Sequence, residues 1–452
     1  MTTLDLNRIQ GFVVRGYRLA LMRYLFLRID DPSGAAKWIS EITGEVLTAA
    51  PWSEKPASGL NIAFSYAGLV ALGMPSQTLA SFPEEFREGM AVRASLLGDD
   101  GPSAPANWEA PFGTAEAHVL VMIAAAHPEA LDAHDQRIRA SLGRAGGLSV
   151  VHDEIGRFMP DFREHFGYAD GFAQPDIEGA GLPSQPGDGA PLSGGHWRPI
   201  RAGEFILGYP DEENVLPVAP TPAQLATNGT FLVYRKLHQD VAGFRTQLAH
   251  AGELYPGGEE LLAAKIVGRW RDGTPIDLSP EHPDPAIVAD GDRNNAFSYS
   301  TDSDGLRCPV GAHIRRANPR DSLPFEGKLV NRHRLIRRGI PYGDRLPEGA
   351  ADDGKDRGVL FMCLQASIAR QFEFIQGQWL NGGNAFTLGE DQDVLVGAQD
   401  VDGPHKMTVP GNPPFFVGPL QRVVTVRGGE YFFVPGVNGL EFLASAAGSG
   451  AQ

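Results

Sequence analysis

The stretch Gly358-Val-Leu-Phe-Met-Cys-Leu364, followed by the segment from Gln365 to Trp379, carries the signal from which the fold is predicted. A short apolar run followed by a longer segment of this kind predicts a buried strand and then a helix. The same order occurs earlier, where His118-Val-Leu-Val-Met-Ile123 precedes a predicted helix from about Pro128 to Leu142. Because this strand–helix pair recurs about 240 residues later, we infer duplication of one α+β unit.

Further predicted elements fit the same unit. Tyr24-Leu-Phe-Leu-Arg-Ile-Asp30 is a β-rich run, and Phe231-Leu-Val-Tyr-Arg-Lys-Leu237 resembles it in apolar content. The first half is also expected to contain a helix over Ala35–Leu47, a strand over Asn61–Tyr66 and a short helix over Ala67–Leu72. The region Gly179–Pro199, rich in Gly, Pro and Ser, is the expected linker. We therefore predict one module over residues 1–200 and a second over residues 201–452.

Composition and charge exclude several classes of protein. The 452 residues include 39 Lys and Arg against 55 Asp and Glu, which gives a formal net charge of −16. A hydrophobic fraction of 42% and a charged fraction of 21% are typical of a globular protein with a sizeable core. The acidic balance argues against nucleic acid as a partner, because a protein that binds nucleic acid needs a basic face. It also argues against an anionic membrane surface as a partner.

The cysteines and the N-terminus indicate the compartment. Cys308 and Cys363 cannot form a disulfide framework, and their apolar or proline-flanked settings predict buried thiols. The N-terminal stretch lacks a basic n-region, a twin arginine and a small-residue cleavage site. The longest apolar run, Val119 to Ala126, is too short to span a bilayer. We therefore expect a cytoplasmic protein.

The first candidate for chemistry is the stretch Phe166-Gly-Tyr-Ala-Asp-Gly171. Gly167 and Gly171 flank Asp170 and allow the backbone to turn tightly, so that the carboxylate is held in a defined place. The alternative interpretation is a turn in which Asp170 caps a following helix.

The second candidate is His313, which follows Gly311-Ala312 and precedes a cationic stretch containing Arg315, Arg316 and Arg320. The small residues would let a planar ligand approach closely, and the arginines could pair with carboxylates. The alternative is a histidine with a structural role.

The third candidate is the stretch Asn331-Arg-His-Arg-Leu-Ile-Arg-Arg-Gly339, an unusual cationic cluster in an acidic protein. The cluster is either a solvated face that neutralises neighbouring acids or the source of one fixed guanidinium in a pocket. A guanidinium in a pocket would stabilise developing negative charge.

Taken together, Gly167-Tyr-Ala-Asp-Gly171, His313-Ile-Arg315 and Arg337-Arg-Gly339 resemble, in this order, the marks of the dye-decolorizing peroxidase (DyP-type) family of haem proteins. The resemblance spans nearly the whole chain through supporting stretches at 9–17, 61–73, 82–90, 204–211 and 361–379. It implies an α+β fold of two ferredoxin-like modules with antiparallel sheets, as in the dimeric α+β barrel-like superfamily. The haem cavity would lie mainly in the second module.

The resemblance also implies a haem b cofactor, with His313 as the proximal ligand of the iron. The second nitrogen of such a histidine is usually held by a carboxylate or a carbonyl. For that acceptor we select Asp393, with Asp391 and Asp400 as alternatives.

On the distal side, the resemblance implies that Asp170 moves protons on hydrogen peroxide. Arg337 would oppose the charge that develops as the O–O bond breaks, with the adjacent Arg338 as the alternative. Leu360 and Phe361 would line the distal pocket with apolar side chains.

The implied activity is a peroxidase that oxidises dyes, phenolics or other organic donors in one-electron steps through Compound I. Because an aspartate stays ionised well into acid, we expect an acidic activity optimum. Bulky donors would be oxidised from the surface, with Trp379 and Tyr342 as candidate relay aromatics or, alternatively, as core packing. Two other functions remain open, a non-enzymatic haem carrier and an enzyme that releases iron from haem.

Overall fold

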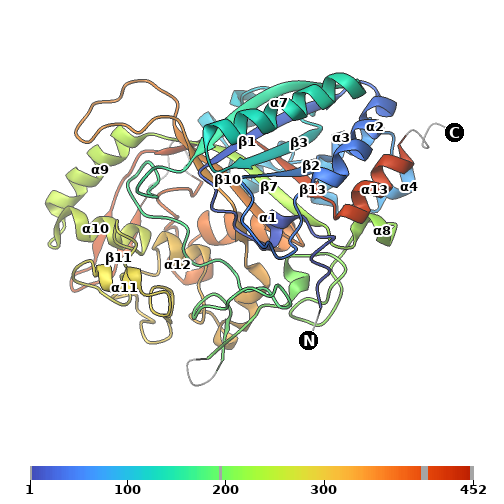
Figure 1. The fold of residues 1–452 in the computed structure, drawn as a ribbon. Coiled ribbons are helices and arrows are strands. Elements are labelled where there is room, and N and C mark those ends of the chain that lie inside the picture. The colour runs from blue at the N-terminus through green and yellow to red at the C-terminus, as the bar shows by residue number, and fades with distance from the viewer. Residues whose placement is uncertain (1–2, 193–195, 399–405, 448–452) are drawn as a thin grey trace.

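The computed structural model describes residues 3–192, 196–398 and 406–447, and within these ranges nine strands form one antiparallel sheet (Figure 1). The strand order is β4-β1-β3-β2-β13-β7-β10-β8, and β9 pairs with β10. These strands are β1 (Leu21–Ile29), β2 (Ser58–Phe64), β3 (Val119–Ala125), β4 (Leu148–Arg157), β7 (Thr230–Gln239), β8 (Ile336–Arg337), β9 (Ile340–Tyr342), β10 (Gly358–Gln365) and β13 (Val424–Val434).

The two halves of the sheet share one strand order. In the N-terminal half the strands lie side by side in the order β4, β1, β3, β2, and in the C-terminal half in the order β13, β7, β10, β8. When the four strands of each half are numbered along the chain, both orders read fourth, first, third, second. This is the arrangement of two ferredoxin-like modules. The predicted α+β fold with antiparallel sheets is therefore confirmed. The halves join where Phe433 of β13 pairs with Phe64 of β2, and the division at residue 200 stays a prediction.

Some of the helices begin after a residue whose side chain caps the first turn. The helix expected over Ala35–Leu47 is α2 (Pro32–Ile42) followed by a 3₁₀ turn, because Asp31 accepts a hydrogen bond from the Gly34 amide and Pro32 suits a first helical turn. The other longer helices are α7 (Pro128–Ala145), α9 (Val241–Leu254), α10 (Gly258–Val267) and α13 (Val437–Ala446). The short helices are α1 (Gly11–Val14), α3 (Tyr66–Ala71), α4 (Ser76–Ala80), α5 (Glu84–Glu88), α6 (Ala94–Leu97), α8 (Ala223–Ala226), α11 (Pro285–Ala289) and α12 (His313–Ala317).

The described residues form three hydrophobic cores, two of them large and a small third one around Val330, Ile375 and Trp379. The larger core contains apolar side chains of the sheet and of the helices α2, α7 and α13. These three helices lie on the same side of the sheet in Figure 1. A second core forms beneath α9 and α10 and contains Phe166, Tyr168 and Ala312. This second core holds in place both the segment that carries Asp170 and the segment that carries His313.

The remaining elements differ little from expectation. Gln365 is the last residue of β10, and the helical part of the segment that follows is π-helical over Ala369–Glu373 and Ile375–Leu380. Cys308 and Cys363 are buried free thiols, as predicted. Among the described residues, no helix is both long enough and apolar enough to cross a membrane. Small two-stranded pairings are formed by β5 (Ala190–Pro191) with β6 (Trp197–Arg198) and by β11 (Met407–Val409) with β12 (Phe415–Val417).

Candidate active site

His313 is the first residue of α12, and its imidazole faces a large cavity with 31% of the side chain exposed. Its Nδ1 lies 2.8 Å from Oδ2 of Asp393, which is almost completely buried. The other carboxylate oxygen, Oδ1, accepts hydrogen bonds from the amides of Leu395 (3.0 Å) and Val396 (2.9 Å). Because Nδ1 is engaged, Nε2 is the ring nitrogen that remains to bind a ligand in the cavity.

The charges of this pair support each other. Burial alone would lower the pKa of His313, but the charge and the hydrogen bond of Asp393 outweigh burial and raise that pKa. For Asp393, burial raises the pKa, but His313, the Val396 amide and the charge of Arg316 reverse the shift and lower it. Of the two alternatives, Asp391 instead accepts a hydrogen bond from the Thr408 amide, and Asp400 lies outside the described residues.

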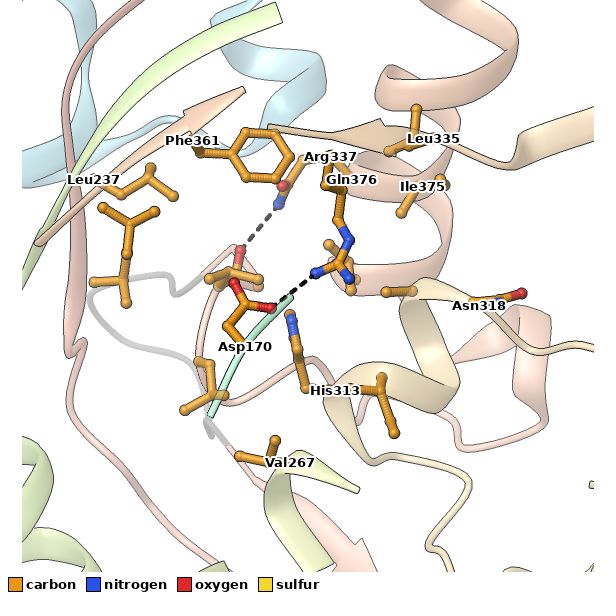
Figure 2. A pocket seen from close by; sticks show the side chains of 18 of the residues that line it. Asp170, Leu237, Val267, His313, Asn318, Leu335, Arg337, Phe361, Ile375 and Gln376 are labelled. Atoms are coloured by element: carbon orange, nitrogen blue, oxygen red, sulfur yellow. Dashed lines mark hydrogen bonds and ion pairs between the residues drawn. The ribbon is translucent and has the colours of Figure 1, made fainter. Parts of the chain in front are cut away.

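Asp170 and Arg337 meet across the same cavity. Nη1 of Arg337 lies 3.6 Å from Oδ1 of Asp170, and Figure 2 shows the His313 imidazole directed at the space beside them. Nη2 of Arg337 also donates to the carbonyl oxygen of Phe172, at 2.7 Å. Gly167 and Gly171 both adopt left-handed φ angles, of +96° and +94°, so the turn around Asp170 depends on glycine.

Arg337 and the adjacent Arg338 point in opposite directions. Arg337 lines the cavity, whereas Nε of Arg338 donates to the carbonyl oxygen of Phe12 at 2.7 Å. Successive side chains of an extended segment lie on opposite faces, so only one of the pair can reach the cavity. Of the two candidates, the structure therefore places Arg337 beside Asp170.

The same alternation corrects the expectation for Leu360. Val359 and Phe361 of β10 line the cavity, but Leu360, which is fully buried, belongs to the main core instead. The expectation placed two consecutive strand residues on one face, which the period-2 geometry of a strand does not allow. Phe361 keeps the expected position.

The cavity has a volume of about 370 Å³ and a mostly apolar wall. Apolar side chains from β7, β10, α10, the residue before β8 and the helical segment after β10 supply much of that wall, among them Leu237, Val267, Leu335, Phe372, Ile375 and Leu380. Figure 2 shows several of them around Asp170 and His313.

One part of the wall is strongly cationic. Arg269, Arg320 and Arg334 are buried there, and they donate hydrogen bonds to neutral carbonyl oxygens. Burial and the like charge of Arg320 lower the pKa of both Arg269 and Arg334 to about 10. Buried charges of this kind are stabilised by an anionic partner, so this region suits a ligand that carries carboxylates.

Several parts of the site had not been predicted. The sequence did not point to Arg269 or to Glu164, whose carboxylate lines the cavity, and Arg334 belonged to the predicted cationic cluster without being singled out. Trp379 and Tyr342, the two candidate relay aromatics, are 3% and 6% exposed. Trp379 packs edge-on against Phe374, and the Tyr342 hydroxyl donates to Asp356. Their role in electron transfer stays a prediction.

The sequence and the fold both have close counterparts among known proteins. Residues 8–158 match the family described as the DyP dimeric alpha+beta barrel domain. The chain is 31% identical to a dye-decolorizing peroxidase of Mycena epipterygia, over 98% of this chain and 88% of that protein. A fungal DyP-type peroxidase from Auricularia auricula-judae has a similar structure, with a TM-score of 0.85 and 28% identity over 98% of this chain and 100% of that one. A dye-decolorizing peroxidase in complex with 2,6-dimethoxyphenol covers the same shares, with a TM-score of 0.82 and 28% identity.

Proposed function

Because the chain belongs to the dye-decolorizing peroxidase family and is an enzyme of the peroxidase class, we propose that it binds haem b and uses hydrogen peroxide to oxidise dyes, phenolics and related organic donors in one-electron steps. The observation that carries the proposal is the meeting of an acid–base group, a cation and a histidine in one cavity. Asp170 and Arg337 lie 3.6 Å apart, and the imidazole of His313 faces the same space. A haem carrier would need only the histidine.

The residues present fit a haem. In the described part of the chain, no cluster of three or more His, Cys, Asp or Glu side chains could hold a bare metal ion. A single histidine is instead the donor set for an iron that a porphyrin already coordinates. The apolar wall suits the porphyrin face, and Arg269, Arg320 and Arg334 would pair with its two carboxylates.

His313 would hold the iron through Nε2, and Asp393 would keep its imidazole in the required tautomer. When bound, the haem supplies the iron centre that takes an oxygen atom from peroxide and passes oxidising equivalents to the donor. The chain's own contribution is to orient the peroxide and move its proton.

Asp170 provides the proton transfer. Its carboxylate would take the proton from one oxygen of hydrogen peroxide and return it to the other, which then leaves as water when the O–O bond breaks. The Asp170 side chain is 63% exposed and lies on a turn that opens into the cavity, so it is accessible to a peroxide molecule. Because an aspartate stays ionised well into acid, the proposal includes an acidic activity optimum.

Arg337 provides the positive charge for the breaking of the O–O bond. Its guanidinium is held by the Phe172 carbonyl, which leaves Nη1 directed at Asp170. A fixed cation in this position stabilises negative charge on the departing oxygen, and because it is already oriented no reorganisation is needed.

The proposal is tested by titrating the purified protein with haem b and then adding hydrogen peroxide at several pH values. We expect a Soret band on binding, and oxidation of 2,6-dimethoxyphenol and of an anthraquinone dye that is fastest in acid. Binding without peroxide-dependent oxidation would favour a carrier. Release of metal-free protoporphyrin would favour iron removal instead.

A further inference from the structure

The turn that carries Asp170 is built around a carboxylate. The bridge between Arg163 and Ala169 closes the turn, and the next amide, that of Asp170, donates to the carbonyl oxygen of Phe162 at 3.3 Å. Asp170 therefore follows directly on the closed turn. Any change in the shape of the turn would move its carboxylate.

Glu164 lies inside this turn and accepts three hydrogen bonds. Oε1 accepts from the Tyr168 amide at 2.9 Å, and Oε2 accepts from the Phe166 amide at 2.8 Å. Oε2 also accepts from Nε2 of Gln239 at 2.7 Å. An ionised carboxylate that accepts from neutral donors in a partly buried setting makes strong, directional bonds, and removing it would leave those amides without an acceptor.

Gln239 anchors the arrangement to the sheet. It is the last residue of β7, it is 6% exposed, and its own amide donates to the Arg357 carbonyl oxygen at 2.9 Å. The turn is held at its tip as well, because Arg271 donates to the Phe166 carbonyl oxygen at 2.7 Å. A chain of hydrogen bonds thus runs from the rigid sheet through Glu164 to the turn of Asp170.

We propose that Glu164 is a positioning residue for the peroxide reaction, and that it acts through Asp170 with Gln239 as its anchor. This inference rests on the proposed function. Glu164 touches no reacting atom in this account, and it sets where the Asp170 carboxylate stands relative to Arg337 and the cavity. A catalytic group displaced by about 1 Å can lose on the order of 100-fold in rate, which sets the size of the expected effect.

The test is Glu164→Gln in the haem-loaded protein, measured in the Asp170 background and in the Asp170→Asn background. In the Asp170 background we expect the second-order rate with peroxide to fall by roughly 10- to 100-fold. The rate of the later step, in which a phenolic donor is oxidised, should stay unchanged. The absorption spectrum of the haem-loaded protein before peroxide is added should also stay unchanged. In the Asp170→Asn background, Glu164→Gln should have no further effect on the peroxide rate.

A matched control and a second variant complete the design. Glu430 is also a partly buried carboxylate and accepts hydrogen bonds from two backbone amides, those of Met90 and Tyr431, but it does not line the cavity. Glu430→Gln should leave the peroxide rate unchanged. If the Glu164→Gln protein does not fold, Gln239→Met is the second variant. It removes one of the three hydrogen bonds that Glu164 accepts, and it should also lower the rate with peroxide.

Amide hydrogen exchange gives a readout that needs no activity. Exchange in the turn around Phe166 and Tyr168 should accelerate in the Glu164→Gln protein and remain slow in the Glu430→Gln protein. Unchanged exchange, an unchanged peroxide rate, or an equal loss of rate in both Asp170 backgrounds would each overturn the proposal. If the wild-type protein does not react with peroxide, the proposed function fails, and hydrogen exchange still decides whether Glu164 orders the turn.

Discussion

Replacing Asp393 by asparagine should weaken haem binding through the tautomer of His313. In the wild-type protein, Oδ1 of Asp393 accepts from two backbone amides and Oδ2 lies 2.8 Å from Nδ1 of His313. An asparagine has one oxygen to offer. Placing that oxygen toward the two amides preserves two hydrogen bonds, whereas placing it toward the imidazole preserves one and sets the side-chain NH₂ against two N–H donors.

The favoured orientation therefore turns an NH₂ group toward Nδ1 of His313. The imidazole then accepts at Nδ1 and carries its proton on Nε2, the nitrogen needed for iron. Loss of such a supporting carboxylate typically weakens metal binding by about 10- to 100-fold. That range corresponds to about 1.4–2.7 kcal/mol of binding free energy.

The assay is a titration of the apoprotein with haem b, followed by the Soret band. Asp391→Asn is a matched control, because Asp391 is an equally buried neighbour that accepts from the Thr408 amide and does not contact His313. We expect a Kd that rises 10- to 100-fold for Asp393→Asn and changes less than about twofold for the control. Equal Kd values and identical spectra for Asp393→Asn and wild type would refute this role of the carboxylate.

Three further predictions concern the cavity and its surroundings. Arg337→Leu should retain haem and slow the reaction with peroxide by about 100- to 1,000-fold in stopped-flow measurements, and a full rate in this variant would exclude the guanidinium from the step. In a fluorescence titration, the apoprotein should bind protoporphyrin IX more tightly than the dimethyl ester of protoporphyrin IX, and Arg334→Leu should reduce this difference in affinity. Equal affinities of the wild-type protein for the two ligands would argue against recognition of the carboxylates. Burial lowers the pKa of His134 and His165 to about 4, below the value of about 6.5 in the unfolded chain. The unfolded state therefore binds more protons, and the free energy of unfolding should fall by up to about 3 kcal/mol per histidine as the pH drops from 6.5 to 4. Urea unfolding of the apoprotein at both pH values measures this change, and an unchanged free energy of unfolding would contradict the prediction.

Much of the fold could be predicted because its strands are encoded locally. All seven residues of β3 are buried, and a continuous apolar run marks such a strand without any knowledge of its neighbours. The repeat of a strand and a helix in the second half predicted the duplication of one α+β unit, and the structure adds that the two halves of the sheet have the same strand order. The exact ends of α2 depended on Asp31 and Pro32, which apolar spacing does not reveal.

The site was predictable only where chemistry lies in short stretches. Asp170 and His313 stand in recognisable local settings, whereas the face on which Arg337, Arg338 or Leu360 lies depends on strand register, and a shift of one residue inverts it. Glu164 was missed because a glutamate that accepts backbone amides inside a turn has no sequence pattern to distinguish it from an exposed one. The buried arginines Arg269 and Arg334 come from distant segments that only the folded chain brings to one wall.

The reaction of the haem-loaded protein with hydrogen peroxide is the most direct test of the proposed function. Stopped-flow mixing at mildly acidic pH should show a rapid Soret change in the wild-type protein, with a second-order rate at least about 100-fold lower in Asp170→Asn at equal haem content. A wild-type Soret band that does not respond to peroxide would contradict the proposed peroxidase function, and an Asp170→Asn protein that reacts as fast as the wild type would exclude Asp170 as the acid–base group.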